Sequence, residues 1–358
     1  MQILVLGMHR SGTSAVVRLL NMMGASLGPA DRVKGANPEN PKGFWENDDV
    51  VEIDNAVLAA QRCLWDRLGA FDAAKLSDER LATLKGRARD VVIRLDTSRP
   101  WAVKDPRMCL LLPFWRDLLE VPVCVVVHRD PLEVAMSLRT RNDMPLHAGL
   151  AMWELHMLEA LRESAGWPRL LVQYERIIDD PVNQTEVLRE RFEAAGVRGL
   201  NRPEEGEITA FIDPTLRREK ASDEDRDAYL TPPQRCLADA LADGSALEMA
   251  DVPAISPLAK EVLRAYDETL RGWGRIDQLK DILREREEEL SQIREALNGL
   301  QEGRPGDKAE AGGGKELAAL RAEVARLHAR LGGIEQALAV LTGVTPPTEL
   351  TGGKSEED

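Results

Sequence analysis

An eight-residue loop near the N-terminus has the composition of an anion-binding site. The segment Gly7-Met8-His9-Arg10-Ser11-Gly12-Thr13-Ser14 follows a short apolar run and opens a helical pattern. Backbone N–H groups and the positive end of a helix dipole favour an anion at such a turn. Arg10 adds a cation, and Thr13 and Ser14 add hydroxyl donors. We therefore expect this loop to bind a phosphate or a sulfate-bearing group.

The loop differs from the nucleotide P-loop at one position. Gly7 and Gly12 have the G-x4-G spacing, but Thr13 stands where a Walker loop has the lysine that reaches the β- and γ-phosphates. A second cation, Arg129, follows an apolar run where a metal-binding aspartate would stand, and an arginine there suits a second anion. A P-loop kinase of small molecules is therefore the less favoured alternative, and neither a metal nor a redox cofactor is implied.

Three apolar runs predict the strands that position these residues. The runs Ile3–Leu6, Val121–Val127 and Leu170–Gln173 do not alternate with polar residues, which is typical of parallel strands covered on both faces. Helical patterns follow the first two runs. We therefore predict an α/β fold, a three-layer sandwich with a central parallel sheet and a P-loop-like turn.

Composition narrows the class of protein. The chain has 358 residues, of which 43% are apolar, enough for a sizeable core. The formal net charge of −14 argues against broad binding of nucleic acid or anionic membranes. No run approaches the roughly 18 apolar residues of a membrane span, and the N-terminus lacks a signal-peptide pattern, so we expect a cytoplasmic protein. The spacing of the cysteines fits neither zinc nor disulfides and predicts four buried thiols: Cys63, Cys109, Cys124 and Cys236.

The chain changes character near residue 275. We predict a globular domain over 1–275, a coiled-coil helix over 276–300, a flexible linker over 301–315, a second coiled-coil helix over 316–342 and a disordered tail over 343–358. The heptad positions are Ile276, Leu279, Leu283, Leu290, Ile293, Leu297 and Leu300, then Leu317, Leu320, Val324, Leu327, Leu331, Ile334, Leu338 and Leu341. They predict a homo-oligomer or an antiparallel hairpin within the chain, which the sequence does not distinguish. The alternative is one amphipathic helix packed on the domain.

Four segments resemble motifs of the sulfotransferases that use 3′-phosphoadenosine 5′-phosphosulfate (PAPS). Residues 10–14 (Arg-Ser-Gly-Thr-Ser) resemble the 5′-phosphosulfate loop, and Arg129 with Ser137 resembles the 3′-phosphate motif. Lys104, within Trp-Ala-Val-Lys-Asp-Pro-Arg, resembles the lysine that faces the transferred group. Tyr174, followed by glutamate, resembles the pair that closes the nucleotide side. The resemblance spans about residues 1–220 and leaves the heptads outside.

This resemblance implies a sulfotransferase domain over residues 1–275, with PAPS as donor and 3′-phosphoadenosine 5′-phosphate (PAP) as product. The acceptor would be a hydroxyl, expected on a carbohydrate or glycoconjugate. Lys104 would meet the bridging oxygen, while Arg129 and Ser137 would bind the 3′-phosphate. The 5′-phosphosulfate would be cradled by Arg10, Ser11, Gly12, Thr13 and Ser14. A catalytically silent scaffold assembled by the heptads is a further alternative.

A later basic cluster, Arg217, Arg218 and Lys220, either closes over the 3′-phosphate, as a late basic segment does in the family, or forms a solvated face.

The general base is the least constrained assignment. Sulfotransferases that act on phenols and steroids carry a catalytic histidine two residues after the lysine, and Pro106 stands there. The chain resembles members that act on carbohydrates or peptides with a glutamate base, and we choose Glu46. Trp45 beside it would raise the pKa of Glu46. The alternative is that Glu46 is a surface residue capping the following helix.

Asp105 is the other candidate for the base. It is expected instead to orient Lys104 or Arg107 through an ion pair. Together with Glu46, the predicted catalytic residues are Lys104 and Arg10. His9 is expected to be a hydrogen-bonded loop histidine.

Overall fold

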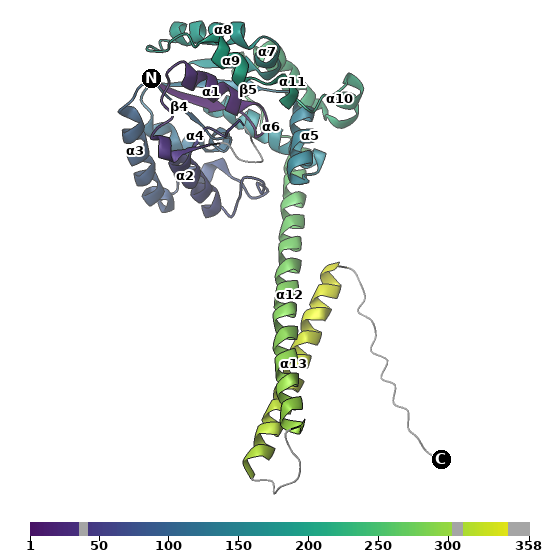
Figure 1. Cartoon of the computed structure of the whole chain (residues 1–358). Helices are drawn as coiled ribbons and strands as arrows, with labels where there is room; N and C mark the ends of the chain where they lie inside the picture. Colours follow the sequence, from purple (N-terminus) through teal and green to yellow (C-terminus); the bar gives the residue numbers. More distant parts are fainter. Residues whose placement is uncertain (36–41, 303–310, 343–358) are drawn as a thin grey trace. The chain divides into compact units, whose positions relative to one another are not determined.

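The computed structural model describes residues 1–35, 42–302 and 311–342. Contacts within the chain divide it into two compact units, Met1–Asp267 and the residues from Glu268 onward. Figure 1 shows the course of the chain. The two units are considered separately below.

A four-stranded parallel sheet forms the centre of the first unit. Its strands are β1 (Gln2–Leu6), β4 (Trp101–Lys104), β5 (Pro122–His128) and β6 (Arg169–Gln173), in the order β4-β1-β5-β6. β1 is central, and all its residues are buried. The predicted runs therefore correspond to β1, β5 and β6. β4 has only four residues, and its hydrophobic run was too short to be predicted as a strand.

The two faces of the sheet are buried in two separate hydrophobic clusters. Ile3 and Val5 of β1 belong to one cluster, and Leu4 and Leu6 belong to the other, because successive side chains of a strand point to opposite faces. The first cluster includes residues of α1 (Thr13–Met22), α7 (Tyr174–Asp179), α8 (Pro181–Ala194) and α9 (Glu205–Phe211). Helices on both faces of a parallel sheet confirm the three-layer α/β sandwich.

The second cluster lies on the opposite face of the sheet. Its helices are α2 (Asp48–Ala60), α3 (Ala82–Asp96), α4 (Met108–Trp115), α5 (Pro131–Asn142), α6 (Leu146–Glu163) and α11 (Pro232–Asp243). A short antiparallel pair, β2 (Val33–Lys34) and β3 (Glu46–Asn47), precedes α2, and α10 (Asp223–Tyr229) precedes α11. The 3₁₀ helices are Ala30–Arg32, Ala73–Ser77, Glu79–Leu81, Arg116–Leu118, Pro214–Leu216 and Ser245–Glu248.

The cysteines are not all buried as predicted. Cys63, Cys109 and Cys124 are buried, whereas Cys236 is exposed on α11. The buried face of α11 carries Leu237 and Leu241 and leaves Cys236 outside. Across the described residues, no helix combines the length and the apolar content that a membrane span requires.

Two long helices carry the heptads. α12 spans Pro257–Glu302 and α13 spans Ala311–Thr342. Leu290 of α12 is buried with Leu327 and Leu331 of α13, and Leu283, Ile293 and Val324 pack around them. The heptad seams of the two helices therefore cover one another within the chain, as in the hairpin alternative. Self-association stays a prediction.

The interval between the two helices is shorter than the predicted linker. α12 continues to Glu302, and α13 begins at Ala311, so the glycines at 312–314 are helical rather than part of a linker over 301–315. A glycine costs a helix only about 1 kcal/mol relative to alanine, and the packed helix that follows offsets this cost. The predicted tail over 343–358 lies outside the described residues.

Candidate active site

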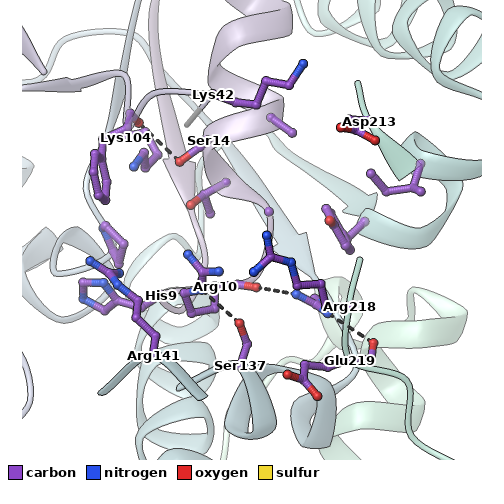
Figure 2. Close-up of a pocket in the computed structure, with 18 of the residues that line it drawn as sticks. His9, Arg10, Ser14, Lys42, Lys104, Ser137, Arg141, Asp213, Arg218 and Glu219 are labelled. Carbon is purple, nitrogen blue, oxygen red and sulfur yellow. Dashed lines mark hydrogen bonds between the residues drawn. The ribbon is translucent and has the colours of Figure 1, made fainter. Parts of the chain in front are cut away.

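A cavity of about 390 Å³ opens beside the loop between β1 and α1. It also receives residues from the ends of β4 and β5, as is usual for ligand sites of parallel sheets. Figure 2 shows its lining, with Lys104 and Arg218 on opposite sides. Among the described residues, its cations are Arg10, Lys42, Lys104, Arg129, Arg141 and Arg218, and its carboxylates are Glu46, Asp213 and Glu219. A chain of net charge −14 therefore concentrates positive charge here.

The loop turns into α1 at a glycine that no other residue can replace without strain. Gly12 has φ +87°, and a Cβ placed on it would lie 2.1 Å from the ring of Tyr174. This close approach explains how Tyr174, predicted to close the site, reaches the loop. Thr13 and Ser14 line the cavity, and the first turn of α1 has no acidic residue. The positive end of the helix therefore faces the cavity without a built-in counter-charge.

Ser11 is the loop residue that the structure places differently. Its side chain is completely buried, its Oγ has no hydrogen-bond partner among the described residues, and it does not line the cavity. Its amide N–H donates to the carbonyl of Met8 at 3.1 Å. Ser11 therefore shapes the turn, and its hydroxyl lies outside the predicted cradle.

Arg10, Arg129 and Ser137, which were expected at two different phosphate groups, contact one another in the structure. Arg10 Nε donates to Ser137 Oγ at 3.0 Å, and Arg129 Nη1 donates to the Arg10 carbonyl at 3.0 Å. The Arg129 guanidinium also lies over the Tyr174 ring, 4.9 Å from its centroid. Asp130 caps α5 by accepting from the amides of Leu132 and Glu133, which fixes the turn that carries Arg129. We call the group Arg10, Gly12, Arg129, Ser137 and Tyr174 the loop end of the cavity.

The charge of Arg10 is uncompensated. Burial, together with the positive charges of Arg141 and Arg129, holds the pKa of Arg10 below its ordinary value. Within the described chain, Arg10 forms no ion pair with a carboxylate; its side chain donates to Ser137 instead. An anion bound at the loop end would relieve this repulsion.

The structure separates the two arginines of the later basic cluster. Arg218 lines the cavity, whereas Arg217 does not. Arg217 Nη2 instead donates to Glu133 Oε1 at 2.8 Å. Of the three residues of this cluster, Arg217, Arg218 and Lys220, Arg218 is the one that lines the cavity.

Glu46 and Lys104 face each other at the other side of the cavity. Lys104 Nζ donates to Glu46 Oε1 at 2.5 Å, and the two side chains are 2% and 8% exposed. β3 carries Glu46, and β4 carries Lys104 at its last position. Glu46 is not the helix cap of the alternative hypothesis, because Asn47 caps α2 by accepting from the Val50 amide. We call Glu46, Lys104, His9, Phe44 and Pro106, all lining residues, the Glu46 end.

The ring of Trp45 contacts residues other than Glu46. Its ring packs under the Arg18 guanidinium, 4.3 Å from the centroid, and against Phe211, and its Nε1 donates to the Lys42 carbonyl. The left-handed backbone of Trp45, at φ +57°, turns this ring away along the rim while Glu46 enters the β2–β3 pair.

Asp105 is completely buried and does not line the cavity. Its Oδ1 accepts from the Arg107 amide at 2.9 Å and from Arg107 Nη1 at 2.6 Å. Asp105 therefore orients Arg107, one of the two alternatives foreseen for its ion pair. Nearby Asp54 accepts from Trp115 Nε1, and burial followed by the charge of Asp105 raises the pKa of Asp54 well above its ordinary value.

Two histidines lie close together at the Glu46 end, His9 in the lining and His156 buried next to it. His9 lines the cavity, and its ring centroid lies 4.8 Å from Trp65 and 6.1 Å from His156. Burial, followed by the charge of Arg107, lowers the pKa of His9 well below its ordinary value. His9 Nε2 has no partner among the residues that the structure describes, so this nitrogen does not make the expected hydrogen bond. Burial also lowers the pKa of His156 to about 4.

Sequence reasoning missed Lys42, Arg141 and Glu219 in the lining of the cavity. Arg141 had a signal, since it follows Ser137 by four residues and so shares its helix face. Lys42 and Glu219 lie in irregular segments, where spacing carries no such information.

Comparison with known proteins finds one matching family and two similar structures. A model described as "Sulfotransferase family" matches residues 2–195. The chain is similar to the sulfotransferase domain of the Synechococcus PCC 7002 olefin synthase, with 17% identity over 74% of this chain and 94% of the other, at a TM-score of 0.35. It is also similar to the sulfotransferase domain of the curacin biosynthetic pathway, with 13% identity over 73% and 95% of the two chains, at a TM-score of 0.33. No curated protein matches the chain.

Proposed function

The chain belongs to the sulfotransferase family, and on that premise we propose that it transfers a sulfuryl group from PAPS to an acceptor hydroxyl and releases PAP. The observation that carries the proposal is the guanidinium of Arg10, which pairs with no carboxylate among the residues that the structure describes. It lies in a glycine turn at the start of α1, and Ser137 and Arg129 hold it there. This arrangement suits a ligand with two separate anionic groups.

The residues at the loop end fit the donor. Arg10, Thr13, Ser14 and the backbone at Gly12 would hold the 5′-phosphosulfate at the N-terminus of α1. Arg129, Ser137 and Arg218 would hold the 3′-phosphate, and Tyr174 would close the nucleotide side. Arginine suits these contacts because its planar donors match the oxygens of a phosphate. Arg217 is left out of this set because its guanidinium is paired with Glu133.

The Glu46 end would carry the chemistry. The bond between sulfur and the bridging oxygen of the donor breaks while a bond from sulfur to the acceptor oxygen forms, and the acceptor proton moves to the Glu46 carboxylate. Lys104 Nζ would leave Glu46 for the bridging oxygen as negative charge develops there. Loss of its lysine partner makes Glu46 the better base. Arg10 would stabilise charge on the transferred group.

We propose a hydroxyl of a carbohydrate or glycoconjugate as the acceptor, following the glutamate base and the absence of a histidine at Pro106. Acceptor loops vary among enzymes of one fold, so this part is tested by a screen. Radiolabelled PAPS offered with sugars, glycolipids, hydroxyl-bearing peptides and phenols should label a sugar-bearing acceptor. Label confined to a phenol or a peptide would overturn the carbohydrate assignment.

Isothermal titration tests the donor. PAP should bind at least tenfold more tightly than 5′-AMP, the minimum expected for a 3′-phosphate held by charge-assisted hydrogen bonds, roughly 1.5–3 kcal/mol each. ATP with Mg²⁺ should bind more weakly than PAP. Preference for ATP with Mg²⁺ would support a kinase, and no binding of any of the three nucleotides would support a silent scaffold.

A further inference from the structure

A buried carboxylate lies just outside the cavity, beside the subsite assigned to the 3′-phosphate. Glu133, in the first turn of α5, is 1% exposed. Its Oε2 accepts from Arg129 Nε at 3.1 Å and from Arg217 Nε at 3.3 Å, and its Oε1 accepts from Arg217 Nη2 at 2.8 Å. Glu133 does not line the cavity. It therefore binds two guanidinium groups without touching the ligand space.

Charge alone argues against a carboxylate at this place. A negative group beside a phosphate subsite repels the phosphate, and a buried one interacts more strongly than an exposed one. Burial opposes ionisation of Glu133, yet the hydrogen bond from Arg217 and the charges of Arg129 and Arg217 outweigh it and hold its pKa below the ordinary value. The carboxylate is therefore charged at neutral pH, and its benefit must come from geometry.

The geometry shows what the carboxylate fixes. With Nε held by Glu133, Arg129 directs Nη1 to the carbonyl of Arg10 and Nη2 to the carbonyl of Glu219, at 3.0 and 3.5 Å. Arg129 thus contacts both the loop and the later segment that carries Arg218. Arg217 attaches this segment to α5 through the same carboxylate.

The same segment has two further attachments to α5 and the turn before it. Thr140 donates to Glu219 Oε1 at 2.9 Å, and Arg226 pairs with Asp130 at 2.6 Å. These contacts hold residues 217–226 against α5 and the turn before it, with Arg218 facing the cavity.

We propose that Glu133 is a positioning residue for the 3′-phosphate subsite: it holds Arg129 between the loop and the 217–226 segment, and it uses Arg217 to anchor that segment so that Arg218 faces the phosphate. The inference rests on the proposed function. It gives Arg217 the role of an anchor instead of a phosphate ligand.

The test is a comparison of PAP and 5′-AMP affinities by isothermal titration in the full-length protein. Glu133→Gln keeps the shape of the side chain and removes its charge. It should weaken PAP binding about tenfold, which is the scale of one charge-assisted hydrogen bond. It should weaken 5′-AMP binding less than about threefold. Arg217→Met keeps the Arg129–Glu133 contact, so it should weaken PAP binding by a smaller factor, between about threefold and tenfold. A purely structural role would lower the affinities for both nucleotides equally.

The matched control is Glu154→Gln. Glu154, on α6, is an equally buried carboxylate, 1% exposed, which accepts from the amide and hydroxyl of Ser256 and does not line the cavity. It should leave the ratio of PAP to 5′-AMP affinity unchanged. Tighter PAP binding by Glu133→Gln, as electrostatic repulsion alone predicts, would overturn the inference, as would an unchanged ratio.

Two further results separate the possible failures. If the wild-type protein does not prefer PAP to 5′-AMP, the proposed function fails. If Glu133→Gln does not fold, the test uses Glu133→Asp and Arg217→Met. Glu133→Asp keeps the carboxylate, and Arg217→Met keeps the contact between Arg129 and Glu133. An unchanged ratio in both would overturn the inference.

Discussion

The two ends of the cavity are built in different ways. At the loop end, Arg10 lies in the loop after β1, Arg129 directly follows β5, and Ser137 lies on the next helix. At the Glu46 end, the central contact joins two residues 58 positions apart, on β3 and β4. Contacts at both ends join residues that are distant in the sequence, but each loop-end residue belongs to a short local motif, whereas Glu46 was chosen without one.

The two ends also differ in charge. The loop end holds the Arg10 guanidinium without a carboxylate partner in the described chain, and burial lowers its pKa. The Glu46 end is internally neutral, since Glu46 and Lys104 form a buried ion pair. Under the proposed function, an anion should therefore gain most at the loop end, while the Glu46 end would become reactive once a ligand attracts Lys104. Substitutions at the Glu46 end should affect kcat, and those at the loop end should affect affinity.

The largest expected effect is that of Glu46→Gln. Because it removes the proposed base, it should lower kcat by roughly 10²–10⁴-fold. The dissociation constant of PAP should change by less than about threefold, because Glu46 lies away from the phosphate contacts. Assays with labelled PAPS measure kcat, and titration with PAP measures the dissociation constant.

Asp213→Asn is the matched control for Glu46→Gln, because Asp213 is another carboxylate that lines the cavity. It should leave kcat within about threefold. A kcat loss below threefold for Glu46→Gln would reject Glu46 as the base and leave it only the role of holding Lys104.

A smaller effect is expected on the stability of the fold, and it comes from two buried histidines, one near each end of the cavity. His128 precedes Arg129, and His156 lies behind His9. Burial lowers the pKa of each from 6.5 to about 4. Between these pH values the unfolded chain binds more protons than the native one, so the free energy of unfolding falls as the pH drops below about 6.5. Each histidine should cost about 2 kcal/mol at pH 5.

Urea denaturation at pH 7.5 and pH 5.0 measures this loss. His128→Gln and His156→Gln should each reduce the difference in unfolding free energy between the two pH values by about 2 kcal/mol. The exposed His147→Gln variant controls for the new glutamine. An undiminished difference in either variant would show that its histidine does not remain neutral in the folded protein.

The sequence predicted the fold where burial leaves a clear pattern. β1 and β5 are buried on both faces and read as continuous apolar runs, and the glycine turn after β1 pointed to the loop that lines the cavity. β4 has only four residues, and β2 and β3 have two each, so no period could reveal them. The helical residues 312–314 were missed because helix packing offsets the weak propensity of glycine.

The candidate site, like the fold, was predicted where the local sequence carries a pattern. Motifs with fixed spacing placed Arg10, Arg129 and Ser137 in the cavity, and the structure brings them into contact. Spacing cannot show which neighbour of a pair faces inward, so Arg217 and Arg218 were predicted alike. Nor could it show that Ser11 is turned into the core, because this depends on the left-handed residues Arg10 and Gly12 on either side of it.

The smallest expected effect on the cavity is that of removing the heptad helices. All lining residues of the cavity lie within residues 9–219, and the seam of α12 and α13 is covered within the chain. A chain ending at residue 275 should therefore keep kcat and PAP affinity within about twofold, since it retains every described residue that lines the cavity. Light scattering should give the full chain a mass near 39.7 kDa. A multiple of that mass, lost on truncation, would show that the heptads also join chains, and a tenfold loss of kcat would show that one end of the cavity depends on them.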